Sequence, residues 1–408
     1  MNIRELSIEE FKSFSQVHPL GNIYQTIEYG KLKSEHGFEY DLIGYCENDT
    51  ILAASLILYK KINNFYYGYA PKGFLIDYNN SFFLENFTKQ LKEYYSERNF
   101  AFIKINPEIA VGELNKETKN IEYNDNFIII DNLRKCGFKK LKNNLYFESL
   151  LPRFNAILSL NNLSLNNFTK NTRNKVLKGV RKGLTLEHAD KYGINELYPL
   201  IKNKTNKDEF YYKDEFNIFN SNDSIDLFLV SIDYNKYLLN SQNKYNEELS
   251  INAKLNEKIV IKNDTSSINR KMNSDKALLS YKNDIAESTK FMNKQDKTYI
   301  AGALVMKYNN RITFEITGFD NNYKRFSPNY FLYFAILAYY RNNFKYADLF
   351  GISGDFTKDS PYKGLNDFKL GFNPKIYEFI GEFDLPINTK AYEFLIKSGA
   401  LAKEFNKK

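Results

Sequence analysis

The residues in this sequence best suited to chemistry are isolated cations set among aromatic neighbours. Near the C-terminus, the segment GLNDFKLGFNPKIYEFIGEFDLPIN (residues 364–388) places Lys369 between Phe368 and Phe372. A fixed cation in such a place can stabilise an oxyanion as it forms. If the segment is a strand-turn-strand, however, Lys369 is a strand-edge residue whose ammonium reaches water. The residues alone favour this second interpretation.

Two further lysines, Lys33 and Lys72, are candidates for binding an anionic group. Lys33 lies beside Lys31 on a predicted helix, so it either belongs to a solvated helical face or acts as a point charge for phosphate. Lys72 follows a predicted strand in APKGF, where it is either an exposed turn residue or part of a cleft. For neither lysine do the neighbouring residues decide between the two interpretations.

A run of basic residues could contact the phosphates of a nucleic acid. Because the charges occupy several faces of one predicted helix, a charged and solvated helix is the default interpretation. Phosphate contact would instead make binding salt-dependent and independent of sequence. The residues are Lys170, Arg173, Lys175, Lys178, Arg181 and Lys182.

The composition argues against several classes of site. The chain has a formal net charge of +8, which allows anionic partners without requiring them. Two cysteines, Cys46 and Cys136, argue against a disulfide framework. The histidines are too dispersed for a metal site or a His-based triad. The sequence has no Walker loop, no GxGxxG motif and no convincing glycine-rich loop of the CoA-binding type. We therefore expect neither a metal nor a cofactor.

The length and the hydropathy pattern bound the class of protein. A chain of 408 residues fits two or three domains. The N-terminal segment MNIRELSIEEFKSF is charged throughout and lacks the apolar region of a signal peptide. No window reaches the roughly 18 apolar residues of a spanning helix. We expect a cytoplasmic protein, with work at the surface of the cytoplasmic membrane left open.

The elements that would position these residues form two α/β units of the same kind. In residues 1–153, the helices IEEFKSFSQ and QTIEYGKLKSEHGF precede the strands DLIGYCE, ILAASLILYKK and FYYGYAPKG. FFLENFTKQLKEYYSERNF has apolar residues at helical spacing, and AFIKINPEI is a buried strand that ends at Pro107. NFIIIDN and LYFESLLP close the unit.

The second unit begins near Arg153. RFNAILSLNN predicts a strand, and SLNNFTKNTRNKVLKGVRKGL predicts a basic helix that ends at Gly183. An irregular aromatic patch follows DEF, before the strand DLFLVSI. KTYIAGALVMKYNN and RITFEITGF predict a hairpin, and FSPNYFLYFAILAYYRNNF predicts a helix that starts at Ser327 and Pro328. YADLFGISG predicts a strand that runs into a glycine-rich turn.

A polar segment without proline or glycine, residues 238–294, interrupts the second unit. Its sparse apolar residues are mostly three, four, six or seven positions apart, and KNDTSS divides it near the middle. This pattern favours a projecting antiparallel helical hairpin of the coiled-coil type, with disorder as the alternative. The apolar residues expected at the seam between the helices are Tyr245, Leu249, Leu255, Ile259, Ile268, Met272, Leu279, Ile285 and Phe291.

Several of these stretches resemble, in order, segments of the Fem family (FemABX) of tRNA-dependent aminoacyltransferases, which build peptidoglycan cross-bridges. QTIEYGKLKSEHGF resembles the family's Gln-Ser-x-x-Trp-Gly-x-x-Lys segment, with Tyr29 in place of Trp and Lys33 at the lysine. GYAPKGFLIDY resembles Tyr-x-Pro-Arg-Gly-Pro, with Lys72 in place of Arg. FIKINPEI resembles Lys-Ile-Asp-Pro, with Lys104 at the lysine and Asn106 in place of Asp.

The resemblance continues through the second unit and implies the fold. NTRNKVLKGVRKGL, FSPNYFLYFAIL and YADLFGISG resemble the family's basic helix, late helix and late strand, and DFKLGFNPKIYEFIGEFDLPIN resembles its Phe-Lys-x-Gly-Phe end. The implied fold is α/β (α+β), with two tandem acetyltransferase-like (GNAT-like) units. The first domain would comprise residues 1–153 plus 376–408, and the second would comprise 154–375 with the arm 238–294 inserted.

The resemblance also assigns roles to residues. Lys369 would be catalytic and would contact substrate phosphate or the developing negative charge. Lys33 would bind phosphate together with a basic residue of the second domain, for which we prefer Lys213 over Lys207. The residues expected to bind substrate are Tyr29, Lys33, Lys72, Lys104, Lys213, Tyr330 and Phe368, and those expected to contact tRNA are Arg173, Lys178, Arg181 and Lys182.

Asn106 departs from the family pattern at a position expected to be catalytic. An acceptor amine must lose a proton before it attacks, and an asparagine cannot take that proton. Glu108, two residues on, is the candidate to replace the missing carboxylate. The alternatives are that the substrate supplies the base, or that the protein is a diverged paralogue with altered activity.

The resemblance implies an enzyme that moves an aminoacyl group from aminoacyl-tRNA to the stem-peptide amine of a peptidoglycan precursor. The acceptor would be UDP-MurNAc-pentapeptide or lipid II. Two other functions remain open from the sequence. One is an acyl-CoA-dependent N-acyltransferase on the same fold, and the other is a catalytically quiet muropeptide-binding protein, which the asparagine at position 106 favours.

Overall fold

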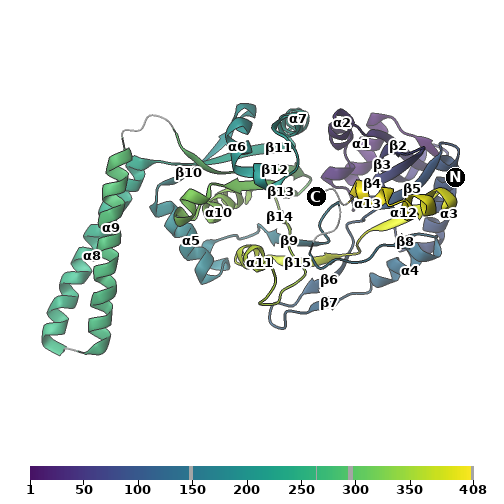
Figure 1. Ribbon diagram of the computed structural model, residues 1–408. Coiled ribbons are helices and arrows are strands. Elements are labelled where there is room, and N and C mark those ends of the chain that lie inside the picture. The colour runs from purple at the N-terminus through teal and green to yellow at the C-terminus, as the bar shows by residue number, and fades with distance from the viewer. Residues whose placement is uncertain (147–149, 263, 293–296, 406–408) are drawn as a thin grey trace.

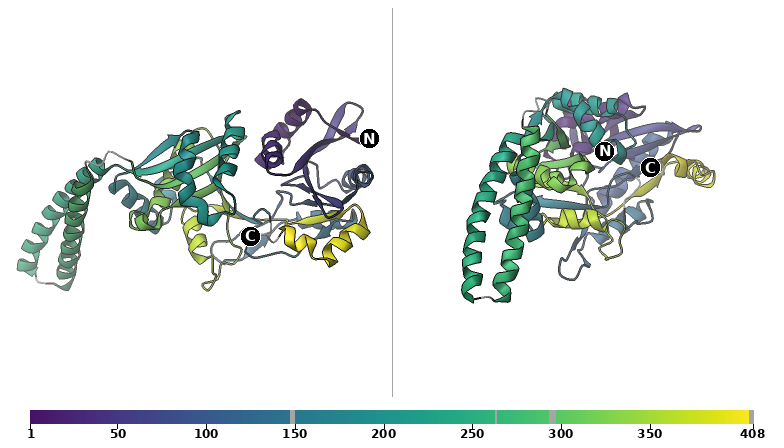
Figure 2. Two further views of the ribbon diagram at one scale, coloured as in Figure 1. Left: turned by 45° about the horizontal axis from the view of Figure 1, so that its top comes forward. Right: turned by 60° about the vertical axis from the view of Figure 1, so that its left-hand side comes forward.

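The computed structural model describes residues 1–146, 150–262, 264–292 and 297–405 (Figure 1). Within this part of the chain, the strands form two sheets, and a long helical hairpin projects from the second unit (Figures 1 and 2). The predicted α/β architecture with an inserted helical hairpin is confirmed. Part of the predicted segment LYFESLLP (147–149) and the end of the predicted arm (293–294) lie outside the described residues.

The first sheet has the strand order β1-β2-β3-β4-β5-β16-β8. Its neighbouring strands are antiparallel except for β4 and β5, which are parallel and are connected through α3. The strands are β1 (Asn2–Glu5), β2 (Glu39–Glu47), β3 (Thr50–Ile62), β4 (Phe65–Ala70), β5 (Phe100–Ile105), β8 (Lys139–Lys140) and β16 (Phe383–Pro386). The helices of this unit are α1 (Ile8–Val17), η1 (Ile23–Gln25), α2 (Ile27–Glu35), α3 (Ser81–Ser96), α4 (Phe127–Lys135), α12 (Thr389–Lys397) and α13 (Ala400–Phe405).

The second sheet has the strand order β10-β11-β12-β13-β14-β9-β15-β6-β7. Its one parallel pair among the described strands, β13 and β14, is connected through α10. The strands are β6 (Ala110–Leu114), β7 (Ile121–Tyr123), β9 (Phe154–Ser159), β10 (Leu184–Ala189), β11 (Ile225–Ile232), β12 (Tyr299–Tyr308), β13 (Arg311–Phe319), β14 (Tyr346–Gly351) and β15 (Lys375–Phe379). The helices are η2 (Leu165–Asn167), α5 (Lys170–Arg181), η3 (Lys191–Gly193), α6 (Ile194–Ile201), η4 (Lys202–Lys204), α7 (Glu209–Asn220), η5 (Asn321–Phe326), α10 (Pro328–Tyr340) and α11 (Lys363–Leu370).

The two units share a design, because each sheet contains one parallel strand-helix-strand crossover among antiparallel neighbours. Each also exchanges strands with the other. The β6–β7 hairpin leaves the first unit and joins the second sheet through β15, whereas β16 returns to the first sheet between β5 and β8. Residues 110–123 therefore lie in the second sheet, although the predicted first domain runs from 1 to 153. The predicted domain boundaries stay a prediction, because sheet membership does not test which segments fold together.

The inserted arm consists of two long helices, α8 (Tyr234–Lys262) and α9 (Thr265–Phe291), which pack side by side. Both views of Figure 2 show it projecting from the second unit. Its seam differs from the predicted apolar one, because the buried positions are largely small or polar. Asn252 donates to the hydroxyl of Ser274 at 3.0 Å across the seam, while Leu249, Met272 and Leu279 are exposed. Ile268 is exposed as well, so the predicted apolar seam is wrong at these four positions.

Two segments form helices where the sequence suggested other structure. Residues 363–370 form α11 and not a strand, so Lys369 lies in the last turn of a helix. The aromatic patch after DEF is also helical and forms α7, which Asp208 caps by accepting from the backbone N–H of Tyr211 at 2.9 Å. Helical spacing places Tyr212, Phe216 and Phe219 in one buried cluster, which explains why so aromatic a segment folds regularly.

Candidate active site

A cavity of about 180 Å³ lies between the two units and is lined by both. The first unit contributes residues between Pro19 and Tyr24 together with Lys72 and Glu108. The second unit contributes the loop after β12, the start of β13 and the end of β14. The polar residues that line the cavity from this unit include Asn155, Arg311, Thr313 and Asp348.

The end of β14 is irregular, and this irregularity organises the polar groups beside the cavity. The pairing of β14 with β9 shifts register between Asp348 and Gly351, and Phe350 has a φ angle of +67°. A bulky residue in this conformation is an outlier, and bulges of this kind are frequent next to active sites. The backbone N–H of Phe350 consequently donates to Oδ1 of Asp348 at 2.8 Å.

Lys369 lies against the same bulge. Its side chain is buried, and Nζ donates to the carbonyl oxygen of Gly351 at 2.5 Å. Burial lowers the pKa of Lys369 to about 7, against the opposing effect of the carboxylate of Asp348. The interpretation of Lys369 as a strand-edge lysine with a hydrated ammonium is therefore wrong. A buried lysine that titrates near neutral pH is a candidate functional group.

A close contact between α11 and α5 fixes the position of Lys369. A Cβ atom on Gly371 would lie 2.1 Å from Oγ1 of Thr172, so only glycine fits at this position. The carbonyl of Gly371 accepts from the backbone N–H of Thr169, the N-cap residue of α5, at 3.0 Å. The glycine of the FKLGF segment thus permits the contact that holds α11 against the basic helix.

Phe368 and Tyr330 meet next to Lys369, as wall residues would. Their ring centroids are 4.9 Å apart in an edge-to-face arrangement. Phe368 makes a second contact of the same kind with Tyr333, also at 4.9 Å. The structure therefore brings two of the predicted substrate-binding residues, Phe368 and Tyr330, into contact, and neither of them lines the inter-unit cavity.

Glu108 and Lys72 line the cavity from the first unit, but Glu108 is not a free base. It forms an ion pair with Arg311 across the two units. Burial would raise the pKa of Glu108, but Arg311 and Lys72 outweigh it and hold that pKa below its usual value. Lys72 is only 3% exposed, with Nζ over the ring of Phe379 at 4.6 Å, so the alternative of an exposed turn lysine is wrong.

Asn106 makes structural hydrogen bonds that a neutral amide side chain can make. Its Oδ1 accepts from the backbone N–H of Lys72 at 2.8 Å and from the hydroxyl of Tyr69 at 3.2 Å. Lys72 itself has a left-handed backbone with φ of +52°. Asn106 therefore holds the loop that carries Lys72, and it is not among the residues that line the inter-unit cavity.

Lys104 is not brought to the cavity. Its ammonium is buried and pairs with Asp384 at 2.8 Å and with Glu382 at 3.6 Å. Both carboxylates belong to the returning C-terminal segment, which forms β16 beside β5. The geometry thus assigns Lys104 to the attachment of this segment and does not support the predicted substrate contact.

A second polar cluster joins the two units where α2 faces α7. Nζ of Lys33 donates to the hydroxyl of Tyr211 at 3.0 Å and lies over the ring of Tyr29 at 5.1 Å. Burial and the nearby charge of Lys207 both lower the pKa of Lys33. Burial and a second carboxylate, Glu315, raise the pKa of Glu215, whose side chain is buried beside the lysines.

The partner of Lys33 in the second unit is Lys207 and not the preferred Lys213. Nζ of Lys207 lies over the ring of Tyr211 at 3.4 Å, so both lysines contact the same tyrosine. Lys213 instead pairs with Glu209 one turn earlier on α7, at 2.6 Å. The geometry therefore favours Lys207, which the sequence analysis had placed second to Lys213.

The basic helix α5 presents part of its charge at the surface. Arg173 and Lys178 are half-buried, and the guanidinium of Arg181 lies over the ring of Tyr281 of α9 at 5.4 Å. Burial and the neighbouring charges of Lys175 and Arg181 lower the pKa of Lys178. The predicted contact of this helix with tRNA stays a prediction.

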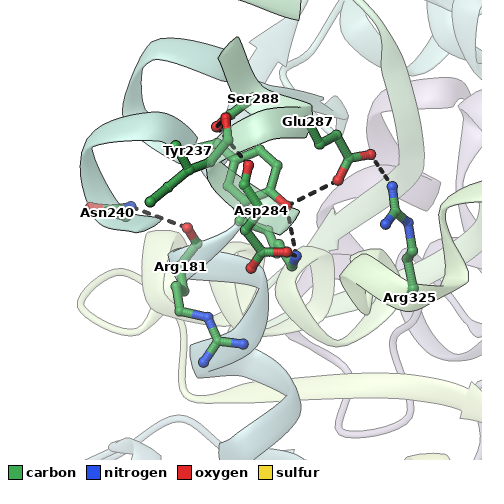
Figure 3. A network of polar contacts seen from close by, with 9 residues as sticks. Arg181, Tyr237, Asn240, Asp284, Glu287, Ser288 and Arg325 are labelled. Carbon is green, nitrogen blue, oxygen red and sulfur yellow. Dashed lines mark hydrogen bonds and ion pairs between the residues drawn. The ribbon is translucent and has the colours of Figure 1, made fainter. Parts of the chain in front are cut away.

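Lys182, at the end of the same helix, does not face solvent. Its ammonium forms a buried ion pair with Asp284 of α9 and donates to the hydroxyl of Tyr237 of α8 at 2.7 Å. Figure 3 shows this network at the base of the arm, where Glu287 accepts from Tyr237 and pairs with Arg325. Lys182 thus anchors the arm, and the prediction that it contacts tRNA at the surface finds no support in its position.

Three polar residues of the inter-unit cavity were not predicted from the sequence. Arg311, Asn155 and Asp348 come from three different strands, and pattern analysis gives no means of placing them together. Asp348 carried one usable signal, because it is an acidic residue inside the apolar strand YADLFG. Charged residues are almost never buried without a partner or a role.

Comparison with known proteins decides the family. The FemAB family model matches residues 6–397. This chain belongs to the FemAB family. It is 26% identical over 395 residues to a lipid II:glycine glycyltransferase of Staphylococcus epidermidis, with 93% of this chain and 92% of that protein covered. The protein of the same name from Staphylococcus aureus is 24% identical, with the same shares covered. A crystal structure of FemX superposes with a TM-score of 0.73 at 22% identity, covering 97% of this chain and all of the other.

These similarities confirm the predicted family and fold, and they identify the FemAB protein as a transferase. Among the described residues, no helix has both the length and the hydrophobicity needed to cross a bilayer. The same residues contain no cluster of three or more side chains suited to hold a metal ion.

Proposed function

We propose that this FemAB protein transfers an aminoacyl group from aminoacyl-tRNA to the stem-peptide amine of a lipid-linked or UDP-linked peptidoglycan precursor. The observation that carries the proposal is the buried Lys369 beside an inter-unit cavity, in a chain whose full-length relatives are named lipid II:glycine glycyltransferases. Those names make glycyl-tRNA the first donor to test and lipid II the first acceptor.

The proposed aminoacyl transfer requires little from the protein beyond alignment of the reactants and stabilisation of charge. An aminoacyl ester is already activated, so the protein need only hold the ester and the amine together, assist loss of the amine proton and stabilise an oxyanion. Lys369 would supply the positive charge for the oxyanion. Lys33 and Lys207, which share contact with Tyr211, would bind the diphosphate of the acceptor.

A lipid-linked acceptor would place the protein at the cytoplasmic face of the membrane as a peripheral partner. The solvent-accessible cations of α5, chiefly Lys170, Arg173 and Lys178, would then contact the phosphates of the tRNA acceptor arm. Such contacts would depend on salt and not on the sequence of the arm.

A transfer assay tests the proposal. Purified protein is mixed with tRNA charged with radiolabelled glycine, and in parallel with other amino acids, and with lipid II or UDP-linked muropeptide. We expect label in the muropeptide that pretreatment with RNase abolishes. Label that requires acyl-CoA and resists RNase would show that aminoacyl-tRNA is not the donor. Muropeptide binding without transfer from any charged tRNA would overturn the proposed catalysis and favour a binding protein.

A further inference from the structure

The proposed function, on which this inference rests, requires a group that accepts a proton from the acceptor amine, and the carboxylates that line the cavity are the candidates. Position 106 carries an amide that is engaged with the Lys72 loop. Glu108 is paired with Arg311, and the pairing holds its pKa low. Of the carboxylates that line the cavity, this leaves Asp348.

Asp348 lines the cavity from β14. In the parallel pairing of β13 and β14 it is the direct neighbour of Thr313, and both side chains line the cavity. Asp348 is 4% exposed, so substrate that fills the cavity would replace water around it.

Each carboxylate oxygen of Asp348 accepts one hydrogen bond that holds it in place, and each can accept another. Oδ1 accepts from the backbone N–H of Phe350 at 2.8 Å, and Oδ2 accepts from Nδ2 of Asn155 at 2.8 Å. Each carboxylate oxygen can accept a second hydrogen bond. The bulge at Phe350 thus aims the carboxylate while leaving it capacity for a donor.

Asn155 adds an independent indication that a donor belongs here. With Nδ2 on the carboxylate, its Oδ1 is buried and has no hydrogen-bond partner within the described residues. An unpartnered buried acceptor costs roughly 1–3 kcal/mol, so it calls for a ligand or a water molecule. Asn155 also lines the cavity. Two acceptors therefore lie together in the cavity wall, which is what an ammonium group requires.

We propose that Asp348, positioned by Asn155, receives the acceptor ammonium and takes its proton before the amine attacks the aminoacyl ester. The ammonium gives one proton to the carboxylate. The neutral amine then forms a C–N bond to the ester carbonyl, and the resulting oxyanion collapses as the C–O bond to the tRNA ribose breaks. The nitrogen loses its second proton to the leaving ribose oxygen, and protonated Asp348 releases its proton to solvent.

The charged groups around Asp348 fit this task. Burial raises the pKa of Asp348, and the carboxylate of Glu108 adds to the increase, whereas Arg311 opposes it. Lys72 and Lys369 face the carboxylate from the first unit and from α11, and Tyr24 faces it from η1. A carboxylate with a raised pKa is a stronger base.

The first experiment compares rates of transfer to lipid II for wild type, Asp348→Asn and Asp348→Ala between pH 6 and 9.5. We expect both variants to lose about 10²- to 10³-fold in kcat, with the remaining rate rising tenfold per pH unit as solvent deprotonates the amine. Formate should partly restore Asp348→Ala. Asp226→Asn, another buried carboxylate of the second unit but outside the cavity, is the matched control and should keep wild-type transfer.

A second measurement separates this inference from the proposed function. Binding of UDP-linked muropeptide with a free third-residue amine is compared with binding of its N-acetylated form. Wild type should prefer the free amine and Asp348→Asn should lose that preference, whether or not transfer occurs. Asp348 is not the acceptor if Asp348→Asn keeps both transfer and preference. The inference would also be overturned by a different combination of results. In that case the variants lose transfer, but their pH profile is unchanged, formate does not rescue Asp348→Ala, and Asp348→Asn still prefers the free amine. Absence of transfer in wild type alone would instead overturn the proposed function.

Discussion

At the scale of single residues, Lys369 is the group whose charge state has the largest consequences. Its ammonium is buried, touches the Gly351 carbonyl and has a pKa lowered to about 7. Replacing it by methionine keeps the packing and removes the charge. We expect Lys369→Met to lose about 10²- to 10³-fold in transfer rate. A rate assay with the melting temperature alongside checks this, and loss of folding would make the residue structural.

The lowered pKa of Lys369 also predicts a pH dependence of stability. The folded state releases the proton near pH 7, whereas the unfolded state keeps it up to about pH 10.4. Between these values the unfolded state binds more protons, so the contribution of Lys369 to stability rises with pH. The wild type should therefore gain stability relative to Lys369→Met as the pH increases from 7 to 10. Denaturant unfolding at each pH measures this difference, and a constant difference would contradict the buried titration.

The cluster around Tyr211 gives a matched pair of lysines. Lys207 contacts that ring with Lys33, whereas Lys213 is paired with Glu209 one turn earlier on α7. We expect Lys207→Ala to raise the KM for the muropeptide acceptor about tenfold to a hundredfold, since it removes a charged contact to phosphate. Lys213→Ala should leave KM unchanged. The reverse outcome would restore the preference drawn from the sequence.

The sequence points to individual lysines more readily than to the residues around them. Lys369 and Lys33 were proposed for the site because each lies in a segment that resembles a segment of the family, and their roles stay predictions. Asp348 and Asn155 were missed because their relationship depends on the pairing of β14 with β9, which no local pattern specifies. The geometry favours Lys207 over the preferred Lys213 for a similar reason, since the contacts of Lys213 depend on α7 beginning at Glu209, which pairs with Lys213 within the helix.

At the scale of elements, the arm is attached through a buried ion pair. The side chains of Lys182 and Asp284 are each less than a tenth exposed, so removing one partner leaves the other as an unpaired buried charge. Lys182→Met should destabilise the junction by about 3–5 kcal/mol, and Lys182→Met with Asp284→Leu should recover most of that loss. Chemical unfolding of both single variants and the double variant measures the coupling. Additive losses would show that the pair does not hold the arm.

For the arm, the two helices were predicted correctly but the residues between them were not. The arm was anticipated from its lack of proline and glycine and from its spacing, but its seam was not. Small side chains such as Ser241 and Ser288 are buried instead, at positions outside the predicted apolar set. A two-helix seam can close on small polar residues because close backbone approach replaces side-chain volume, and spacing alone does not reveal which of several stripes faces the partner helix.

At the scale of the whole molecule, the two units were recognisable but their exchange of strands was not. The β6–β7 hairpin completes the sheet of the other unit, and Glu108, just before it, pairs with Arg311 of the second unit. The cavity is thus built at the point where the chain crosses between the sheets. Long-range strand pairing of this kind follows from tertiary packing, which local hydrophobic periodicity does not encode.

The distribution of charge over the whole molecule predicts how tRNA binding should respond to salt. Arg173 and Lys178 lie on α5, far in the sequence from the exposed Lys397 and Lys403 near the C-terminus. If the α5 surface binds phosphates, each cation removed from it should reduce the slope of log affinity against log salt concentration by about 0.7–0.9. The double variant Arg173→Ala, Lys178→Ala should therefore bind aminoacyl-tRNA more weakly and with a shallower salt dependence, as measured by filter binding over a series of salt concentrations.

A matched charge change elsewhere on the surface separates direct binding from general attraction. The control variant Lys397→Ala, Lys403→Ala removes the same formal charge and should keep the wild-type slope, because long-range attraction without direct binding of phosphate releases no counterions. Equal changes in both variants would show that net charge alone drives binding. An unchanged slope in both variants would place the tRNA elsewhere on the molecule.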